Sequence, residues 1–138
     1  MDVFSRQKRS EVMSRIRGKD NVSTERRMAA LLRSRGIAGW RFRPVDIFGR
    51  PDIYFPHLRL AIFLDGCFWH ACPKCFQMPA QNRSFWVVKV RENLKRDRQV
   101  NRSLRGEGLK VIRLWEHDLE RGTSRLAGLL EMLQPKTG

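Results

Sequence analysis

Residues 63–75 contain the side chains of this 138-residue chain that are best suited to chemistry. They include all three cysteines, one of the three histidines, an aspartate and two adjacent large aromatic residues. Thiolates and imidazole bind transition metals, imidazole and carboxylate transfer protons, and flat rings stack on bases. In a strongly basic chain, this combination favours an enzyme that acts on nucleic acid.

The three cysteines are separated by four and by two residues, as Cys67, Cys72 and Cys75. Thiolates at this spacing can reach one tetrahedral ion, and a structural zinc site needs a fourth ligand. We expect that ligand to be His117, which follows an apolar strand predicted over residues 111–115. If that strand runs parallel to the apolar strand over residues 60–64, their carboxyl ends are neighbours. His70 is the alternative fourth ligand, and three unrelated buried thiols are the alternative to a metal site.

Four carboxylates stand at positions that suit an acidic active site. Glu25 and Asp97 fall on the apolar stripes of two predicted helices, where an unpaired carboxylate is costly. A buried ion pair would explain one such residue, but two of them beside a strand-borne Asp52 favour a shared site. Asp52 opens a strand after Gly-Arg-Pro, and Asp65 ends the next apolar strand. This order resembles the Pro-Asp…(Asp/Glu)-x-Lys pattern of magnesium-dependent nucleases, with Cys67 at the lysine position.

The remaining side chains of the cysteine-rich stretch have two interpretations each. If His70 is not a zinc ligand, it can act as a general acid or base near neutral pH, oriented by Asp97. Phe68 and Trp69 are adjacent and cannot both point into one core from a regular strand. They could insert as wedges between base pairs, or one ring could cover the zinc site or the core.

Hydrophobic periodicity and turn residues predict the elements that position these groups. They are a helix over residues 22–34, strands near 40–42, 52–55 and 60–64, an irregular loop over 65–82, a helix over 83–105, a strand over 111–115 and a helix over 124–133. The strands over 52–55 and 60–64 are close in sequence and should pair antiparallel. A sheet with helices packed against it, in the α/β or α+β class, is expected. We expect one domain over residues 1–138, with an N-terminal arm over 1–20 and a core over 21–134.

The charge of the chain indicates a polyanionic partner. Twenty-eight Lys and Arg residues against 14 Asp and Glu give a formal net charge of +14, which favours double-stranded DNA or RNA. No signal peptide and no apolar run long enough to span a bilayer is present, so no membrane role is expected. An odd number of cysteines fits metal binding in a reducing compartment better than a disulfide framework. We therefore expect a cytoplasmic protein.

The motifs Gly-Arg-Pro-Asp, Asp-Gly-Cys-Phe-Trp-His and Trp-Glu-His resemble the very-short-patch (Vsr) DNA mismatch repair endonucleases, and the resemblance covers nearly the whole chain. It implies an α/β restriction-endonuclease-like core, a mixed central sheet flanked by helices and a structural zinc site. It also implies a magnesium-dependent enzyme that nicks one DNA strand 5′ to the thymine of a T·G mismatch. The resemblance further implies a nucleoid-associated bacterial monomer, with mismatch-repair proteins as further partners.

The resemblance also implies roles for individual residues. Catalytic Mg²⁺ would be held by Asp52 and the backbone carbonyl of Leu64, with His70 as the catalytic histidine and Glu25 and Asp97 as further acidic residues. The zinc set would be Cys67, Cys72, Cys75 and His117, and the DNA wedge would be Phe68, Trp69 and Met13.

Two points stay open at the level of the sequence. Some family members have histidine where this chain has Asp65, so either Asp65 or His70 could be the general base. Two other functions compete with mismatch nicking. One is a restriction-like or mobile-element endonuclease that cuts matched DNA, and the other is a zinc-stapled DNA-binding module without activity.

Overall fold

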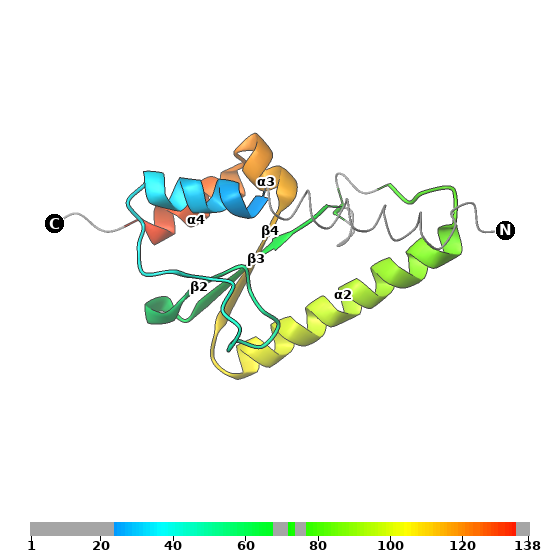
Figure 1. Cartoon of the computed structure of the whole chain (residues 1–138), viewed down its shortest axis with the longest axis horizontal. Helices are drawn as coiled ribbons and strands as arrows, with labels where there is room; N and C mark the ends of the chain where they lie inside the picture. The colour runs from blue at the N-terminus through cyan, green and yellow to red at the C-terminus, as the bar shows by residue number, and fades with distance from the viewer. Residues whose placement is uncertain (1–23, 68–71, 74–76, 135–138) are drawn as a thin grey trace.

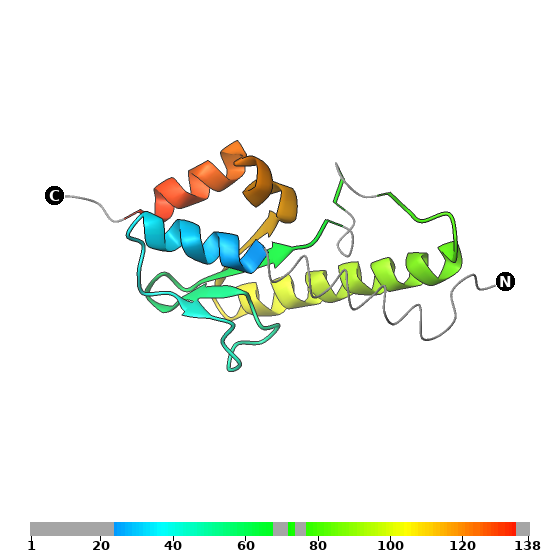
Figure 2. The same ribbon diagram turned by 45° about the horizontal axis from the view of Figure 1, so that its top comes forward.

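The computed structural model describes residues 24–67, 72–73 and 77–134. A mixed four-stranded sheet forms its centre, with helices on both faces (Figures 1 and 2). Several sequence predictions lie outside the described residues: the N-terminal arm, Met13, Phe68, Trp69, His70 and Cys75.

The sheet has the order β1-β2-β3-β4. Its strands are β1 (Arg41–Phe42), β2 (Ile53–Phe55), β3 (Leu60–Asp65) and β4 (Lys110–Trp115). The pairings β1–β2 and β2–β3 are antiparallel, and a one-turn 3-10 helix, η1 (Pro56–Leu58), makes the tight β2–β3 connection. The β3–β4 pairing is parallel. The predicted antiparallel pair is thus confirmed, and the parallel neighbour required to bring His117 toward the cysteines is present.

Four helices are found in the described part of the chain. They are a helix over residues 24–34, α2 (Arg83–Gly106), α3 (Glu116–Arg121) and α4 (Ser124–Leu133). The 24–34 helix and α4 cover one face of the sheet, and α2 crosses the other (Figures 1 and 2). Helix α3 was not predicted, because six residues are too few to show a helical period.

Strand β3 is the centre of both cores. All six of its residues are buried, as its continuous apolar pattern predicts. The side chains alternate between the two faces of the sheet. Leu60, Ile62 and Leu64 therefore join the core under the 24–34 helix and α4. Ala61 and Phe63 pack on the other face against Val100 and Leu104 of α2. Asp65 continues that second face and therefore points toward the α2 side of the sheet.

Helix α2 is long but not apolar. Its buried residues are Trp86, Val90, Val100 and Leu104, and its amino-terminal half extends beyond the sheet (Figure 1). Among the helices of the described residues, none is both long and apolar enough to cross a membrane.

Candidate active site and metal centre

Asp52 lies where β2 begins, beside the carboxyl end of β3. Its backbone amide donates to the carbonyl of Ile62 at 3.0 Å, and its side-chain Oδ2 accepts from the backbone amide of Leu64 at 2.7 Å. The preceding Pro51 is fully buried, and Arg50 adopts a left-handed backbone with φ 49°. The Gly-Arg-Pro turn thus directs the Asp52 carboxyl to the end of the central strand.

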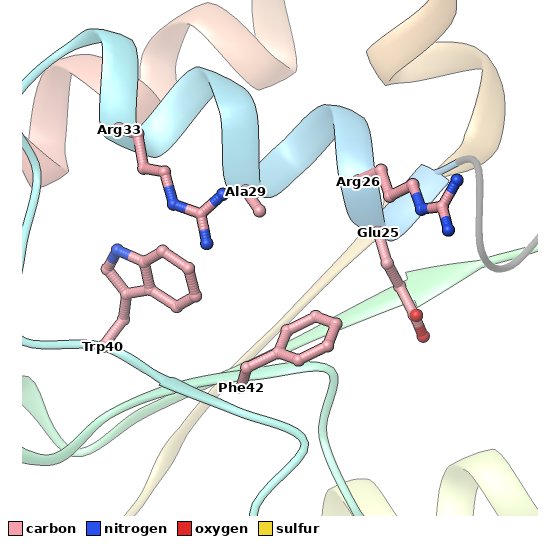
Figure 3. Close-up of a pocket in the computed structure, with 6 residues that line it drawn as sticks. All are labelled: Glu25, Arg26, Ala29, Arg33, Trp40 and Phe42. Carbon is pink, nitrogen blue, oxygen red and sulfur yellow. The ribbon is translucent and has the colours of Figure 1, made fainter.

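Glu25 approaches the same point from the 24–34 helix. It is only 5% exposed, and Figure 3 shows its side chain pointing from the helix toward the sheet. Arg43 holds it in a two-point ion pair, in which Nε donates to Oε1 at 3.1 Å and Nη2 donates to Oε2. The Glu25 carboxyl also lies next to that of Asp52 and raises its pKa. Glu25 is therefore both the buried member of an ion pair with a half-exposed arginine and a neighbour of Asp52.

The surroundings of Asp52 raise the pKa of its carboxyl from 3.8 to about 8. Burial is the largest cause, followed by the hydrogen bond to Glu25 and by the negative charges of Glu25 and Asp65, while the Leu64 amide acts in the opposite direction. At neutral pH the metal-free protein keeps this carboxyl protonated. A divalent cation bound here would replace that proton.

Asp65 and Asp97 meet on the α2 side of the sheet through an arginine that the sequence did not suggest. Arg113, from β4, places Nη1 3.0 Å from Oδ1 of Asp65 and 3.5 Å from Oδ1 of Asp97. The side chain of Asp65 is 7% exposed and that of Asp97 is 19% exposed. Asp97 therefore lies at the edge of the core, in an ion pair, rather than deep inside it.

The four predicted carboxylates thus come from three elements and the start of β2. Glu25 and Asp65 both act on the charge of Asp52, and Asp97 joins Asp65 through Arg113. Carboxylate and carbonyl oxygens are the ligands that Mg²⁺ prefers. The chemistry of these donors suits a catalytic divalent cation. The predicted orientation of His70 by Asp97 stays a prediction, because His70 lies outside the described residues.

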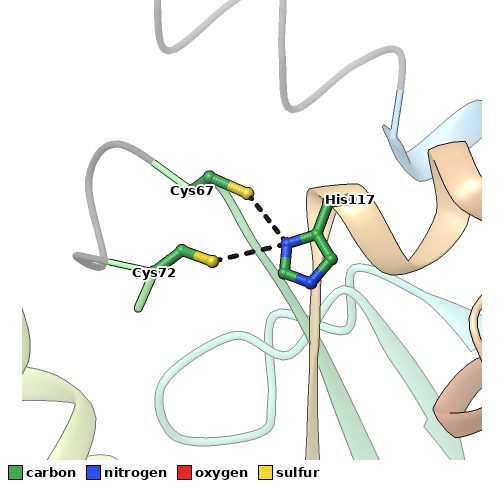
Figure 4. Close-up of side chains that lie close together, drawn as sticks. All are labelled: Cys67, Cys72 and His117. Carbon is green, nitrogen blue, oxygen red and sulfur yellow. Dashed lines mark hydrogen bonds between the residues drawn. The ribbon is translucent and has the colours of Figure 1, made fainter. Parts of the chain in front are cut away.

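A second cluster joins Cys67, Cys72 and His117 (Figure 4). Nδ1 of His117 is 3.5 Å from Sγ of Cys67 and 3.3 Å from Sγ of Cys72, and the three ligand atoms lie within 4.8 Å of one another. Tetrahedral zinc with ordinary bond lengths places sulfur and nitrogen ligands roughly 3.5 Å apart. All three residues are buried, and both thiols are free of disulfides. Three of the four predicted ligands therefore form a group suited to a metal ion.

The parallel pairing of β3 and β4 explains why these residues meet. Asp65 pairs with Trp115 at the ends of the two strands, and Cys67 and His117 each follow two residues later. Asp118 fixes the chain just after His117, since its carboxylate accepts from the Trp115 amide and from the Thr123 hydroxyl, each at 2.7 Å. His117 is thereby held at the amino end of α3.

A surface pocket of about 280 Å³ borders Glu25 between the 24–34 helix and β1 (Figure 3). It is lined by Glu25, Arg26, Ala29, Arg33, Trp40 and Phe42. The guanidinium of Arg33 lies 5.7 Å from the ring centre of Trp40, whose indole Nε1 donates to the carbonyl of Ile37. Basic and aromatic groups thus adjoin the acidic cluster.

Comparison with known proteins decides which family the chain belongs to. The family model for the DNA mismatch endonuclease Vsr matches residues 1–76. The DNA mismatch endonuclease Vsr of Escherichia coli K12 is 37% identical over 127 residues, which cover 91% of this chain and 79% of the relative. The chain belongs to the Vsr family. The family predicted from the sequence motifs is therefore confirmed.

Other relatives carry the description of type II nicking enzymes. V.XorIIP of Xanthomonas oryzae is 35% identical over 138 residues, covering 97% of this chain and 98% of the relative. V.NaeI of Lentzea aerocolonigenes is 48% identical over 69 residues, half of this chain and 42% of the relative. Membership of the Vsr family supports a DNA endonuclease of the mismatch or nicking type, with DNA as its partner. The mixed α/β sheet with flanking helices agrees with the predicted fold class.

Proposed function

We propose that the protein is a magnesium-dependent DNA endonuclease that nicks one strand 5′ to the thymine of a T·G mismatch. The observation that carries this proposal is the part-buried Asp52 carboxyl, whose pKa is raised by the neighbouring Glu25 and Asp65, in a chain of the Vsr family. Such a cluster of acids is costly to bury unless it binds a cation. The net charge of +14 supports binding to the DNA backbone.

The described residues fit a magnesium ion. Asp52 and the backbone carbonyl of Leu64 would hold it, with Asp65 and Glu25 extending the acidic side of the site. When bound, Mg²⁺ draws charge from the scissile phosphate and lowers the pKa of a bound water. Asp52 gives up its proton as the site fills, and Arg43 keeps the Glu25 carboxylate in place. His70, oriented by Asp97, would take the proton of the attacking water, and Asp65 is the alternative base.

The decisive test compares two aspartate variants in a nicking assay. Wild type and Asp52→Asn are incubated with a T·G duplex and with the matched duplex, with and without Mg²⁺. Asp46→Asn is the control, since Asp46 is exposed and pairs with Arg41 at the surface. We expect Mg²⁺-dependent nicking of the T·G strand by wild type and by Asp46→Asn, and loss of nicking in Asp52→Asn. Undiminished activity of Asp52→Asn would contradict the assignment of Asp52.

The same assay separates the competing functions. Equal cleavage of the matched duplex would favour the second candidate, a sequence-specific nicking enzyme, which the names of several relatives suggest. Binding without cleavage in Mg²⁺ would favour a DNA-binding module. If Phe68, Trp69 and Met13 wedge beside the mismatch, replacing Trp69 by alanine would lower the preference for T·G over matched DNA, because a weakly stacked pair accepts an inserted ring most easily.

We also propose that Cys67, Cys72, Cys75 and His117 bind one structural Zn²⁺. Elemental analysis of the purified protein should find about one zinc per chain, as one tetrahedral site requires. His117→Ala should lose most of this zinc and unfold at a lower temperature. His57→Ala is the matched control, because His57 is an exposed histidine of η1. A wild-type protein without zinc, or a His117→Ala variant with full zinc content, would refute the site.

A further inference from the structure

The guanidinium of Arg113 is enclosed by groups from β3 and α2. Its Nε donates to Oδ1 of Asn101 at 2.8 Å, and its Nη1 donates to Oδ1 of Asp65 at 3.0 Å. Oδ1 of Asp97 lies 3.5 Å from the same Nη1. Its Cζ lies 4.2 Å from the ring centre of Phe63, and the side chain is only 17% exposed. These contacts fix both the position and the plane of the guanidinium.

The fold explains why one side chain makes all these contacts. Arg113 pairs with Phe63 across the parallel β3–β4 ladder, and Asp65 follows two residues later on the same face of β3. Asp97 and Asn101 are four residues apart in α2 and therefore lie on one face of that helix. Arg113 thus lies between strand β3 and helix α2, in contact with both.

The charges of the cluster show what this arginine contributes. Among the described side chains, the four carboxylates Glu25, Asp52, Asp65 and Asp97 face two guanidinium groups, those of Arg43 and Arg113. With Asp52 ionised, the net charge is −2, which one divalent cation neutralises. Without Arg113, Asp65 and Asp97 would lose the cation that they share and would repel each other. Lysine could replace the charge but not the fork that reaches Asn101 and Asp65 together.

We propose that Arg113 is a positioning residue of the nicking reaction, which fixes the Asp65 carboxylate relative to Asp97 through Nη1. The inference rests on the proposed function of the acidic site. Arg113 contacts neither DNA nor the metal in this role. It holds Asp65 beside Asp52 and keeps Asp97 next to Asp65.

The test measures Mg²⁺ binding and nicking separately. Mg²⁺ affinity is measured by titration calorimetry on DNA-free protein, and the nicking rate by single turnover on a T·G duplex at saturating Mg²⁺. Arg113→Gln should nick about 10- to 100-fold more slowly, the usual effect of losing a residue that orients a ligand. Its Mg²⁺ affinity should be unchanged or higher, because the variant removes a cation from the site. Arg113→Lys should regain part of the rate, and Arg102→Gln, an exposed arginine of α2, should match wild type.

A double substitution tests the contact itself. If Arg113 acts through Asp65, Arg113→Gln combined with Asp65→Asn should be no slower than the slower single variant. Losses that multiply would overturn the inference, as would a wild-type rate in Arg113→Gln or full recovery of its rate in excess Mg²⁺.

Wild type that nicks no DNA would overturn the proposed function, and with it this role. Wild type and Arg113→Gln that nick equally would overturn this inference alone. Should Arg113→Gln fail to fold by circular dichroism, Arg113→Lys decides the same comparison.

Discussion

Replacing Asp52 by asparagine should stabilise the magnesium-free protein, and the gain should grow with pH. The pKa of the Asp52 carboxyl is about 8 in the folded protein and 3.8 as its ordinary value. Folding therefore favours the protonated form. The contribution of the protonated carboxyl is fully present below about pH 4 and is lost as the pH rises toward 8. An asparagine has no charge to lose and keeps its contribution throughout.

The size of the effect follows from these two pKa values. Each pH unit between them costs wild type up to about 1.4 kcal/mol of unfolding free energy relative to the neutral variant. Between pH 6 and pH 8, the advantage of Asp52→Asn should therefore grow by roughly 2 kcal/mol, since the loss levels off near the folded pKa. Mg²⁺ at pH 8 should close part of this gap, because it binds and stabilises only the ionised wild-type site.

Urea unfolding at pH 6, 7 and 8 measures this difference, with zinc retained and Mg²⁺ removed by washing. Asp46→Asn is the control. The Arg41 guanidinium lowers the pKa of the exposed Asp46 carboxyl, so Asp46 stays ionised across this range and the control difference should be flat. A flat difference for Asp52→Asn as well would refute the reasoning, because it would mean that Asp52 is already ionised in the folded protein at pH 6.

Three further predictions concern the framework around the site, each measured as the free energy of unfolding in urea. Gly49→Ala should cost roughly 2–4 kcal/mol, because Gly49 has φ +80° and a Cβ there would lie 2.4 Å from Cγ1 of Val100. Adding Val100→Ala should recover the steric part, and no recovery would show that backbone strain alone causes the loss. Asp118→Ala should cost about 1–3 kcal/mol, since two hydrogen-bond donors lose their buried acceptor. Leu104→Ala, at a fully buried position of α2, should cost about 2–5 kcal/mol, whereas the half-exposed Val88→Ala should change stability by less than about 0.5 kcal/mol.

The sequence predicted the framework well where hydrophobic patterns are long or continuous. The run over β3 is apolar at five successive positions before Asp65, which indicates a strand covered on both faces, and both cores meet there. The 24-residue α2 carries six helical turns of pattern, so its bounds were predicted within one residue. The carboxylates Glu25 and Asp97 were noticed because they interrupt apolar stripes. That argument needs only local periodicity.

Contacts between distant residues were not predictable in the same way. Arg113 lies in a strand with a mixed burial pattern, and among 28 basic residues it has no distinguishing local feature. Its role depends on the β3–β4 register and on the position of α2 above the sheet. Arg43 is similar, since its contact with Glu25 requires a left-handed backbone with φ 47°. Which cation faces which carboxylate follows only from tertiary structure.

The acidic site and the thiol–imidazole cluster lie at the same end of the β3–β4 pair. The sheet is small, with two residues in β1 and three in β2. Few backbone hydrogen bonds therefore resist the mutual repulsion of Asp52 and Asp65, which lie at the ends of the two central strands. Asp65 and Trp115 form the last pair of the β3–β4 ladder, and beyond them the strands have no further pairing. Cys67 and His117 meet at this point, so a metal ion bound there would hold together the strand ends that carry the acidic site. A metal ion in the thiol–imidazole cluster would oppose this repulsion by joining the strand ends, and Arg113 opposes it by neutralising charge.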